Sequence, residues 1–247
     1  WKAMPGLNGK KVNIEKSYSN MKKDGIFSEK KLVYDAIPPA VHLEDLQASP
    51  IYRGHPDKKM VSFLINVAWG NEYIPDMLET LEKHNVRATF FLEGRWVKDN
   101  PSIAKMIFDA GHELGNHSYT HPNMKTLGSN AVRDQLIKTN EVIEATTGVK
   151  TNWFAPPSGS YRQEVVEIAK ELNMGTIMWS VDTIDWQRPE PHVIVNRVTE
   201  KVHPGALVLM HPTEPTAKAL ETMIISIKEK DLAIDTVSTL LSEERRD

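Results

Sequence analysis

Two histidines, His117 and His121, lie four residues apart in the segment His117-Ser118-Tyr119-Thr120-His121 and are the strongest candidates for chemistry. On one turn of helix or helical loop, this spacing places both side chains on the same side. Neutral imidazoles bind zinc and similar ions. Structural histidines also occur at this spacing, so the pair alone leaves both interpretations open. Its position after an apolar run, where a strand is expected, favours metal ligands.

Two acids and an indole follow another apolar run, residues 175–179. Asp182 and Asp185 stand where a strand is expected to end, and a carboxylate there can orient a histidine or accept a proton. Either acid can equally cap a helix or join a salt bridge. Trp186 offers a flat face on which a sugar ring can stack.

Two further segments combine an expected strand end with a polar group. The run 206–210 contains Leu209 and is followed by His211; a lone histidine is more often structural, but this location favours function. The turn 154–159 contains two prolines, which lack N–H groups. Ser158 therefore carries the first N–H that can face a developing oxyanion, although the turn taken alone is best explained as structural.

The pattern between these segments predicts the fold. Apolar runs at residues 61–67 and 88–92 are expected to be buried strands. Helices are expected at residues 73–84, 101–110, 129–147, 163–172, 191–202 and 216–230. Strands alternating with helices indicate an α/β fold with a parallel sheet. Six or seven such units fit an incomplete (β/α) barrel better than a full eightfold one, and function is then expected at the carboxyl ends of the strands.

The first 57 residues differ from the rest, being polar and rich in lysine. Val12 and Ile14 alternate with polar residues, which predicts a short strand, and residues 15–23 fit a helix. We interpret residues 1–57 as a small N-terminal module or arm with a structural role. Residues 58–247 form the domain that carries the candidate chemistry.

Composition narrows the classes of function. The chain has 247 residues, of which 40% are apolar and 26% charged, as in folded soluble proteins. A net charge of −3 provides no bulk attraction for nucleic acid or an anionic membrane. No apolar run approaches the roughly 20 residues of a membrane span. The absence of cysteine excludes disulfides, thiolate metal sites and a cysteine nucleophile.

In order along the chain, these segments resemble the motifs of the polysaccharide deacetylase family, also called the NodB-homology family or carbohydrate esterase family 4. Residues 116–121, Asn-His-Ser-Tyr-Thr-His, are similar to the histidine metal-binding motif, and residues 88–92 and 111–116 are similar to the strands that flank it. The resemblance runs from about residue 59 to residue 240. It implies a fold of the NodB-homology type and is greatest to a sporulation-associated branch from bacilli.

The resemblance also implies a chemistry. The family hydrolyses an N- or O-acetyl group with one divalent metal ion, held by two histidines and one aspartate, while a neighbouring aspartate acts as base. His117 and His121 are thereby the expected ligands, and zinc the expected metal. The other expected catalytic residues are His211 as acid, Asp185, and Ser158 as oxyanion donor. The expected substrate-binding residues are Trp186, Leu209 and Trp69.

The departures from the family pattern fall on the groups that perform the hydrolysis. Where the family usually has Thr-Phe-Asp-Asp-Gly, residues 66–70 read Asn-Val-Ala-Trp-Gly, so the base is replaced by Ala68 and the metal-binding aspartate by Trp69. Where the family usually has Arg-Pro-Pro-Tyr-Gly, residues 155–159 read Ala-Pro-Pro-Ser-Gly, so Ala155 replaces the arginine. Two histidines without an anionic ligand bind metal weakly, and losing a base typically costs about 10²–10⁴-fold in rate. The candidate substitutes are Glu72, Asp182 and Asp185.

Three hypotheses on function follow. The first is a deacetylase of acetylated cell-wall or spore-wall glycan, peptidoglycan or chitin-like, with weak or lost activity and a weakly bound or absent metal. The second is a non-catalytic glycan-binding protein. The third is a structural protein of the envelope that acts through residues 1–57. All three place the protein outside the cell or in its envelope, and because the chain begins at Trp1 rather than Met, we expect a missing export segment. The sequence does not set the oligomeric state.

Overall fold

A parallel sheet of eight strands forms the centre of the computed structural model, which describes residues 3–245. Seven strands follow the order β7-β6-β5-β4-β3-β9-β8, and β10 pairs with the start of β3. The strands are β3 (Met60–Val67), β4 (Thr89–Leu92), β5 (Glu113–Asn116), β6 (Trp153–Phe154), β7 (Gly175–Thr176), β8 (Val181–Asp182), β9 (Leu207–Met210) and β10 (Ala233–Ile234). The sheet curves into a half-barrel, which confirms the predicted incomplete (β/α) barrel.

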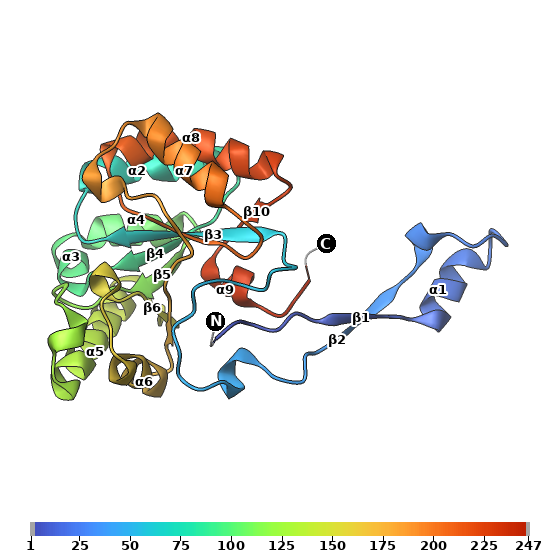
Figure 1. Cartoon of the computed structure of the whole chain (residues 1–247), viewed down its shortest axis with the longest axis horizontal. Helices are drawn as coiled ribbons and strands as arrows, with labels where there is room; N and C mark the ends of the chain where they lie inside the picture. Colours follow the sequence, from blue (N-terminus) through green and yellow to red (C-terminus); the bar gives the residue numbers. More distant parts are fainter. Residues whose placement is uncertain (1–2, 246–247) are drawn as a thin grey trace.

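Helices cover the outer face of this sheet (Figure 1). In that view α2, α7 and α8 lie on one side of the sheet, and α5 and α6 lie on the other. The helices are α2 (Ile74–Lys83), α3 (Gly94–Asp99), α4 (Pro101–Asp109), α5 (Ser129–Thr147), α6 (Gln163–Glu171), α7 (Pro191–Lys201), α8 (Glu214–Glu229) and α9 (Val237–Leu241). No helix within the described residues is long and apolar enough to cross a bilayer.

Strand β3 is buried along all of its eight residues because it has layers on both faces. Alternate side chains point to opposite sides of a strand. Phe63, Ile65 and Val67 therefore join the core beneath the helices, whereas Leu64 joins a second core inside the barrel. The apolar run that predicted this strand reflects burial on both faces.

Part of the N-terminal region completes the barrel. Ile51 pairs with Ile177, just after β7, and Arg53 pairs with Ala206, just before β9. The backbone N–H of Ile51 donates to Thr176 O at 2.8 Å, and that of Met178 donates to Ile51 O at 2.8 Å. Residues 51–53 thus run along the open side of the sheet. The predicted division of the chain at residue 57 remains a prediction.

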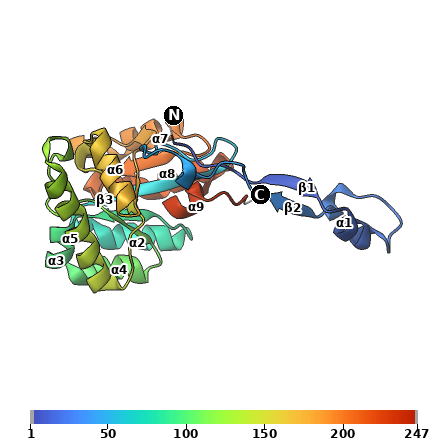
Figure 2. The same cartoon turned by 90° about the horizontal axis from the view of Figure 1, so that it is seen from below.

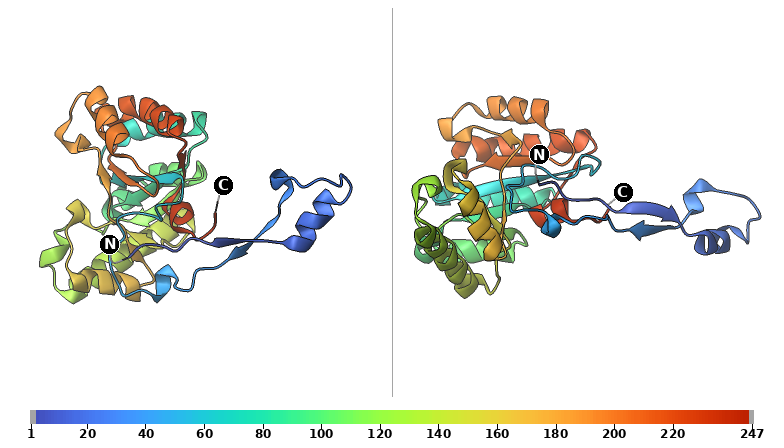
Figure 3. Two further views of the ribbon diagram at one scale, coloured as in Figure 1. Left: turned by 45° about the vertical axis from the view of Figure 1, so that its right-hand side comes forward. Right: turned by 60° about the horizontal axis from the view of Figure 1, so that its bottom comes forward.

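The rest of the N-terminal region forms an arm, residues 9–41, that projects from the barrel in every view (Figures 1, 2 and 3). Strands β1 (Gly9–Val12) and β2 (Tyr34–Ile37) pair in antiparallel fashion, and helix α1 (Ile14–Met21) follows β1. The sequence predicted the helix and a strand before it, but not the partner strand. All four residues of β2 are exposed, so that strand has no apolar alternation to detect.

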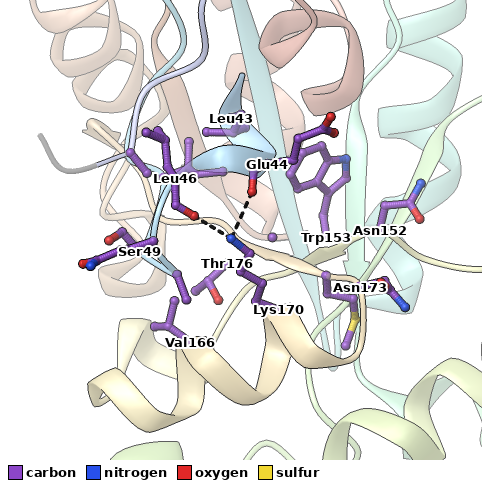
Figure 4. A pocket seen from close by; sticks show the side chains of 16 residues that line it. Leu43, Glu44, Leu46, Ser49, Asn152, Trp153, Val166, Lys170, Asn173 and Thr176 are labelled. Atoms are coloured by element: carbon purple, nitrogen blue, oxygen red, sulfur yellow. Dashed lines mark hydrogen bonds between the residues drawn. The ribbon is translucent and has the colours of Figure 1, made fainter. Parts of the chain in front are cut away.

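A cavity of about 400 Å³ lies between residues 43–49 and the edge of the barrel (Figure 4). Lys170 Nζ lies at this junction and donates to the carbonyl oxygens of Glu44 (3.1 Å) and Leu46 (2.5 Å). The lining includes Trp153 and Gly175, which begin β6 and β7. The cavity therefore lies at the amino ends of the strands, away from the predicted site.

A buried histidine couples this fold to pH. His112 is 5% exposed and packs against Phe90, and its Nδ1 accepts a hydrogen bond from the N–H of Ala88 at 3.1 Å. Burial, and secondarily the charge of Arg87, lower the pKa of His112 to about 4. In the unfolded chain the pKa of a histidine is about 6.5.

We predict that His112→Asn flattens the pH dependence of stability. Between pH 6.5 and 4, His112 is protonated in the unfolded chain but stays neutral in the native protein. The free energy of unfolding is therefore highest above pH 6.5 and falls as the pH drops. Each pKa unit corresponds to about 1.4 kcal/mol, so His112 alone makes this fall up to about 3 kcal/mol. Asparagine keeps an acceptor for Ala88 and cannot titrate.

Urea unfolding at neutral and acidic pH measures the effect. His192→Asn, at an exposed histidine, is the matched control and should leave the pH dependence as in the wild type. Identical pH dependence in wild type and His112→Asn would show that His112 does not carry the coupling.

Candidate functional site

His117 is held at the carboxyl end of β5. Its backbone N–H donates to Leu92 O at 3.0 Å, and its ring, 2% exposed, donates from Nδ1 to the carbonyl oxygen of Ala155 at 2.8 Å. This bond fixes the tautomer and leaves the Nε2 lone pair available. Burial, helped by the neighbouring His121 ring, lowers the pKa of His117 to about 3. The ring is therefore neutral at physiological pH, as a metal ligand must be.

His121 meets His117 through a loop, not a helix. The two ring centroids are 5.0 Å apart and the rings meet edge to face. The expected turn of helix or helical loop was wrong, because Ser118 and His121 have left-handed φ angles of 63° and 54°. The side chain of Asn116 accepts from the N–H of Ser118 at 2.8 Å, and the Ser118 hydroxyl accepts from the N–H of His121 at 3.1 Å. These side-chain bonds replace helical ones, and partial burial lowers the pKa of the His121 ring.

Trp69 lies over His211 at the carboxyl ends of β3 and β9. The ring centroids are 6.0 Å apart and the planes differ by 10°. The indole is 43% exposed, and Ala68 beside it is half-buried. The next residue, Gly70, has φ 84°, and a Cβ there would lie 2.1 Å from Pro212 O. Only glycine allows this approach, which brings the chain after Trp69 against the chain after His211.

Asp185 orients His211 from beneath. The carboxylate has no exposure and accepts three hydrogen bonds: from the His211 N–H (2.6 Å), from His211 Nδ1 (2.8 Å) and from the Thr216 hydroxyl (2.6 Å). These bonds occupy Asp185 within the protein. Asp185 is therefore placed to position the His211 ring and direct its Nε2 outward.

The other predicted residues lie around the same edge of the sheet. Ser158 is exposed in the short 3₁₀ turn Pro157–Gly159 and has a left-handed φ of 52°. Trp186 is 58% exposed and follows Asp185. Leu209 is 5% exposed within β9. Their catalytic and substrate-binding roles remain predictions.

The donor set is incomplete for a tight metal site. No group of three His, Cys, Asp or Glu side chains within residues 3–245 is placed to hold a metal ion. The side chains of Ala68 and Trp69, after the end of β3, offer no atom that binds a metal ion. His117 and His121 therefore supply two ligands, whereas a structural zinc site uses four protein ligands and a catalytic site uses three.

Two residues near the site were missed by sequence reasoning. Thr216 bonds to Asp185, and the Thr-Glu-Pro-Thr pattern before α8 is a recognisable helix cap that could have signalled it. Glu93 follows β4, is 3% exposed, and caps α3 by accepting from the N–H of Trp96 at 3.1 Å. Burial raises the pKa of Glu93. Together with Ala68 and Trp69, Glu93 lines a second cavity of about 400 Å³.

The order of strands, histidines and turn agrees with one protein family. The family model for polysaccharide deacetylase matches residues 53–177. The chain belongs to the polysaccharide deacetylase family. The deacetylase domain thus includes β3 to β7 and the His117–His121 loop.

Relatives with the same fold include active and inactive proteins. A crystal structure of a Bacillus anthracis protein described as a family 4 carbohydrate esterase pseudoenzyme is 62% identical, covers 100% of this chain and 88% of its own, and has a TM-score of 0.94. The Bacillus subtilis protein YlxY, described as uncharacterized, is 60% identical over 99% of this chain and 77% of its own length. The peptidoglycan-N-acetylmuramic acid deacetylase PdaA of B. subtilis is 31% identical, over 78% and 75%.

The Asp185 bonds generate a prediction about stability. Asp185→Ala leaves three donors unpaired in a buried site, and we expect it to lower the free energy of unfolding by about 3 kcal/mol or more. Thr216→Val removes the hydroxyl that donates to Asp185 and accepts from the Thr213 hydroxyl at 2.8 Å, and it should cost about 1–2 kcal/mol. Denaturant unfolding measures both.

Asp182→Ala is the matched control. Asp182 is only half-buried and its side chain accepts from the N–H of Ile184 at 2.8 Å, so its loss should cost about 1 kcal/mol. Equal costs for Asp182→Ala and Asp185→Ala would contradict the central role of the buried carboxylate.

Proposed function

We propose that this protein binds acetylated glycan of the cell envelope and hydrolyses its acetyl groups weakly or not at all. The observation that carries the proposal is the end of β3. There Ala68 and Trp69 take the places of the two carboxylates that the family uses, and Trp69 lies over His211.

The groups that this chain retains support binding of the glycan more than hydrolysis of its acetyl groups. A bound divalent ion would polarise the acetyl carbonyl and activate water. This chain offers His117 and His121 to such an ion, and it positions His211 to give a proton to a leaving amine. It offers no carboxylate at residues 68 and 69 to accept the proton of the attacking water. Weak zinc binding at the histidine pair is part of the proposal.

The relatives support both halves of the proposal. Several relatives that share about a third of their aligned residues with this chain are named as peptidoglycan deacetylases. The B. anthracis relative is described as a pseudoenzyme, and a mutant of it is described as having restored enzymatic activity. We infer a peptidoglycan-like glycan and an envelope location for this chain. A role in sporulation remains a prediction.

Glycan binding without hydrolysis is the form of this proposal that the exposed indoles favour. Trp69 and Trp186 are 43% and 58% exposed beside the site, and flat aromatic faces contribute to binding through stacking and apolar contact. An envelope structural role is the alternative, for which the site would be irrelevant.

Trp186→Ala tests glycan binding. Loss of one stacking face should weaken binding of chito-oligosaccharide or peptidoglycan fragments by roughly tenfold, about 1.4 kcal/mol. Calorimetric titration measures it, with folding checked by circular dichroism. Tyr18→Ala, at an equally exposed aromatic residue on the arm, should bind like the wild type. Unchanged binding in a folded Trp186→Ala protein would remove this role.

The end of β3 generates a prediction about activity. Trp69→Asp should tighten zinc binding by adding an anionic third ligand, and Ala68→Asp should supply a base. Because these groups act as a unit, either change alone should do little. The double variant should release acetate from acetylated glycan at least about 10²-fold faster than the wild type.

Ala155→Arg is the third change, and of the three positions this one tolerates substitution least. Ala155 is 4% exposed within the inner core, so an arginine there needs the new carboxylate at residue 68 as a partner. Alone it should destabilise; in the triple variant it should orient the base. A folded, zinc-loaded triple variant no faster than the wild type would contradict the proposal, as would a wild type that is already fast.

A further inference from the structure

The arm, residues 9–41, lacks a core. Ser17 is the one residue of the arm that is buried. Eight large apolar side chains are instead exposed; they are Val12, Ile14, Tyr18, Ile26, Phe27, Tyr34, Ile37 and Val41. The most exposed include Ile14 (78%), Ile26 (73%) and Phe27 (68%). So much clustered apolar surface on one small projection marks an interaction site.

The arm is also a poor candidate for independent stability. Its two strands share four residue pairs, and no third strand within residues 3–245 pairs with them. A two-stranded hairpin of this kind is only marginally stable in water. An apolar environment that receives the exposed side chains would stabilise it.

Charge is distributed unevenly between arm and barrel. The arm carries seven lysines, at positions 10, 11, 16, 22, 23, 30 and 31, against the four carboxylates Glu15, Asp24, Glu29 and Asp35. It is therefore net positive, although the whole chain is −3. The net charge of the whole chain therefore combines a basic arm with a barrel that is acidic.

Apolar and basic residues meet at the outer end of the arm. Its base lies at Asn8, whose N–H donates to Glu243 O at 2.8 Å, and the β1–β2 ladder runs outward to the pair Val12 and Tyr34. The connection from α1 to β2, residues 22–33, is therefore the end of the arm (Figure 1). Ile26 and Phe27 lie in this connection, with Lys22, Lys23 and Asp24 before them and Glu29, Lys30 and Lys31 after them. Lys31 forms an ion pair with Asp24, and the four lysines outnumber the two acids.

We propose that the arm docks on the surface of an anionic lipid bilayer, with Ile26 and Phe27 inserted among the headgroups and the flanking lysines on the lipid phosphates. Apolar side chains next to basic ones are the composition of interfacial membrane anchors. A soluble polyanion would use the lysines but not the apolar end. A second copy of the chain would use the apolar end without requiring lipid.

The geometry of the barrel gives this docking a consequence. The arm leaves the molecule near α9 and β10, at the amino end of β3, whereas Trp69 and His211 lie beyond its carboxyl end (Figure 1). Eight strand residues separate the two ends, about 26 Å. A bilayer that holds the arm therefore faces the opposite end of the barrel from the candidate site.

Vesicle binding of the full chain tests the proposal. We expect co-sedimentation with vesicles of phosphatidylglycerol and phosphatidylcholine at low salt, and little with phosphatidylcholine alone. Ile26→Ser/Phe27→Ser and Lys22→Glu/Lys23→Glu should each reduce partitioning on the order of tenfold. The controls on the barrel are Met106→Ser/Ile225→Ser and Lys98→Glu/Lys201→Glu, which alter exposed residues of the same kinds and should partition like the wild type.

A local probe covers the case in which the serine variant unfolds the arm. Because the chain has no cysteine, Phe27→Cys can carry a single environment-sensitive fluorophore. Its emission should shift to the blue on adding phosphatidylglycerol vesicles, and the same label at Ile225→Cys should not shift.

Three results would overturn the proposal. The first is no binding of the wild type to anionic vesicles. The second is a blue shift at residue 27 that rises with protein concentration without lipid, which would identify a second copy as the partner. The third is binding of a soluble glycerol-phosphate polymer as strongly as vesicles, with no effect of Ile26→Ser/Phe27→Ser.

Discussion

Strand β3 has parallel neighbours on both sides, and the positions of its last residues follow from those pairings. Val67 lies opposite Leu92 of β4, and Ile65 lies opposite Met210 of β9. The register thereby brings the ends of three strands to one edge of the sheet. Residues 68 and 69 must emerge between the end of β4 and His211 whatever their side chains are. The fold therefore fixes the position of residues 68 and 69. Their side chains decide whether this position carries a catalytic base and a metal ligand or, as here, a methyl group and an indole.

The groups that remain are those on which packing depends. Asp185 accepts three buried hydrogen bonds, so its loss would leave His211 and Thr216 with unpaired donors. Carboxylates at residues 68 and 69 would stand at a partly exposed edge, where Trp69 is 43% exposed. With alanine rather than arginine at the buried position 155, no buried donor there needs a carboxylate at residue 68. A catalytic site can therefore lose its reacting groups while the groups that orient His211 stay in place.

The sequence predicted the elements whose residues are buried in long runs and the site residues that follow them. It did not predict β10, or β8 as a strand separate from the run at residues 175–179, because neither pair of residues forms an apolar run of its own. It placed His117 and His121 on a turn of helix or a helical loop, because residue spacing does not reveal the hydrogen bonds of the Asn116 and Ser118 side chains that give the segment a non-helical backbone. The bond between Asp185 and Thr216 joins residues 31 apart and depends on tertiary packing.

The candidate site and the arm lie at opposite ends of the barrel and differ in the groups that they expose. At the carboxyl ends of the strands, the described residues offer an incomplete set of metal ligands near the exposed indoles of Trp69 and Trp186, an arrangement that supports the proposed binding of a sugar more than the activation of water. At the amino ends an arm without a core extends apolar and basic side chains. Since β3 spans the distance between them, whatever covers the arm leaves the candidate site open. A protein bound to a surface through the arm would present that site to glycan beyond the surface, and this arrangement would not require the site to be catalytic.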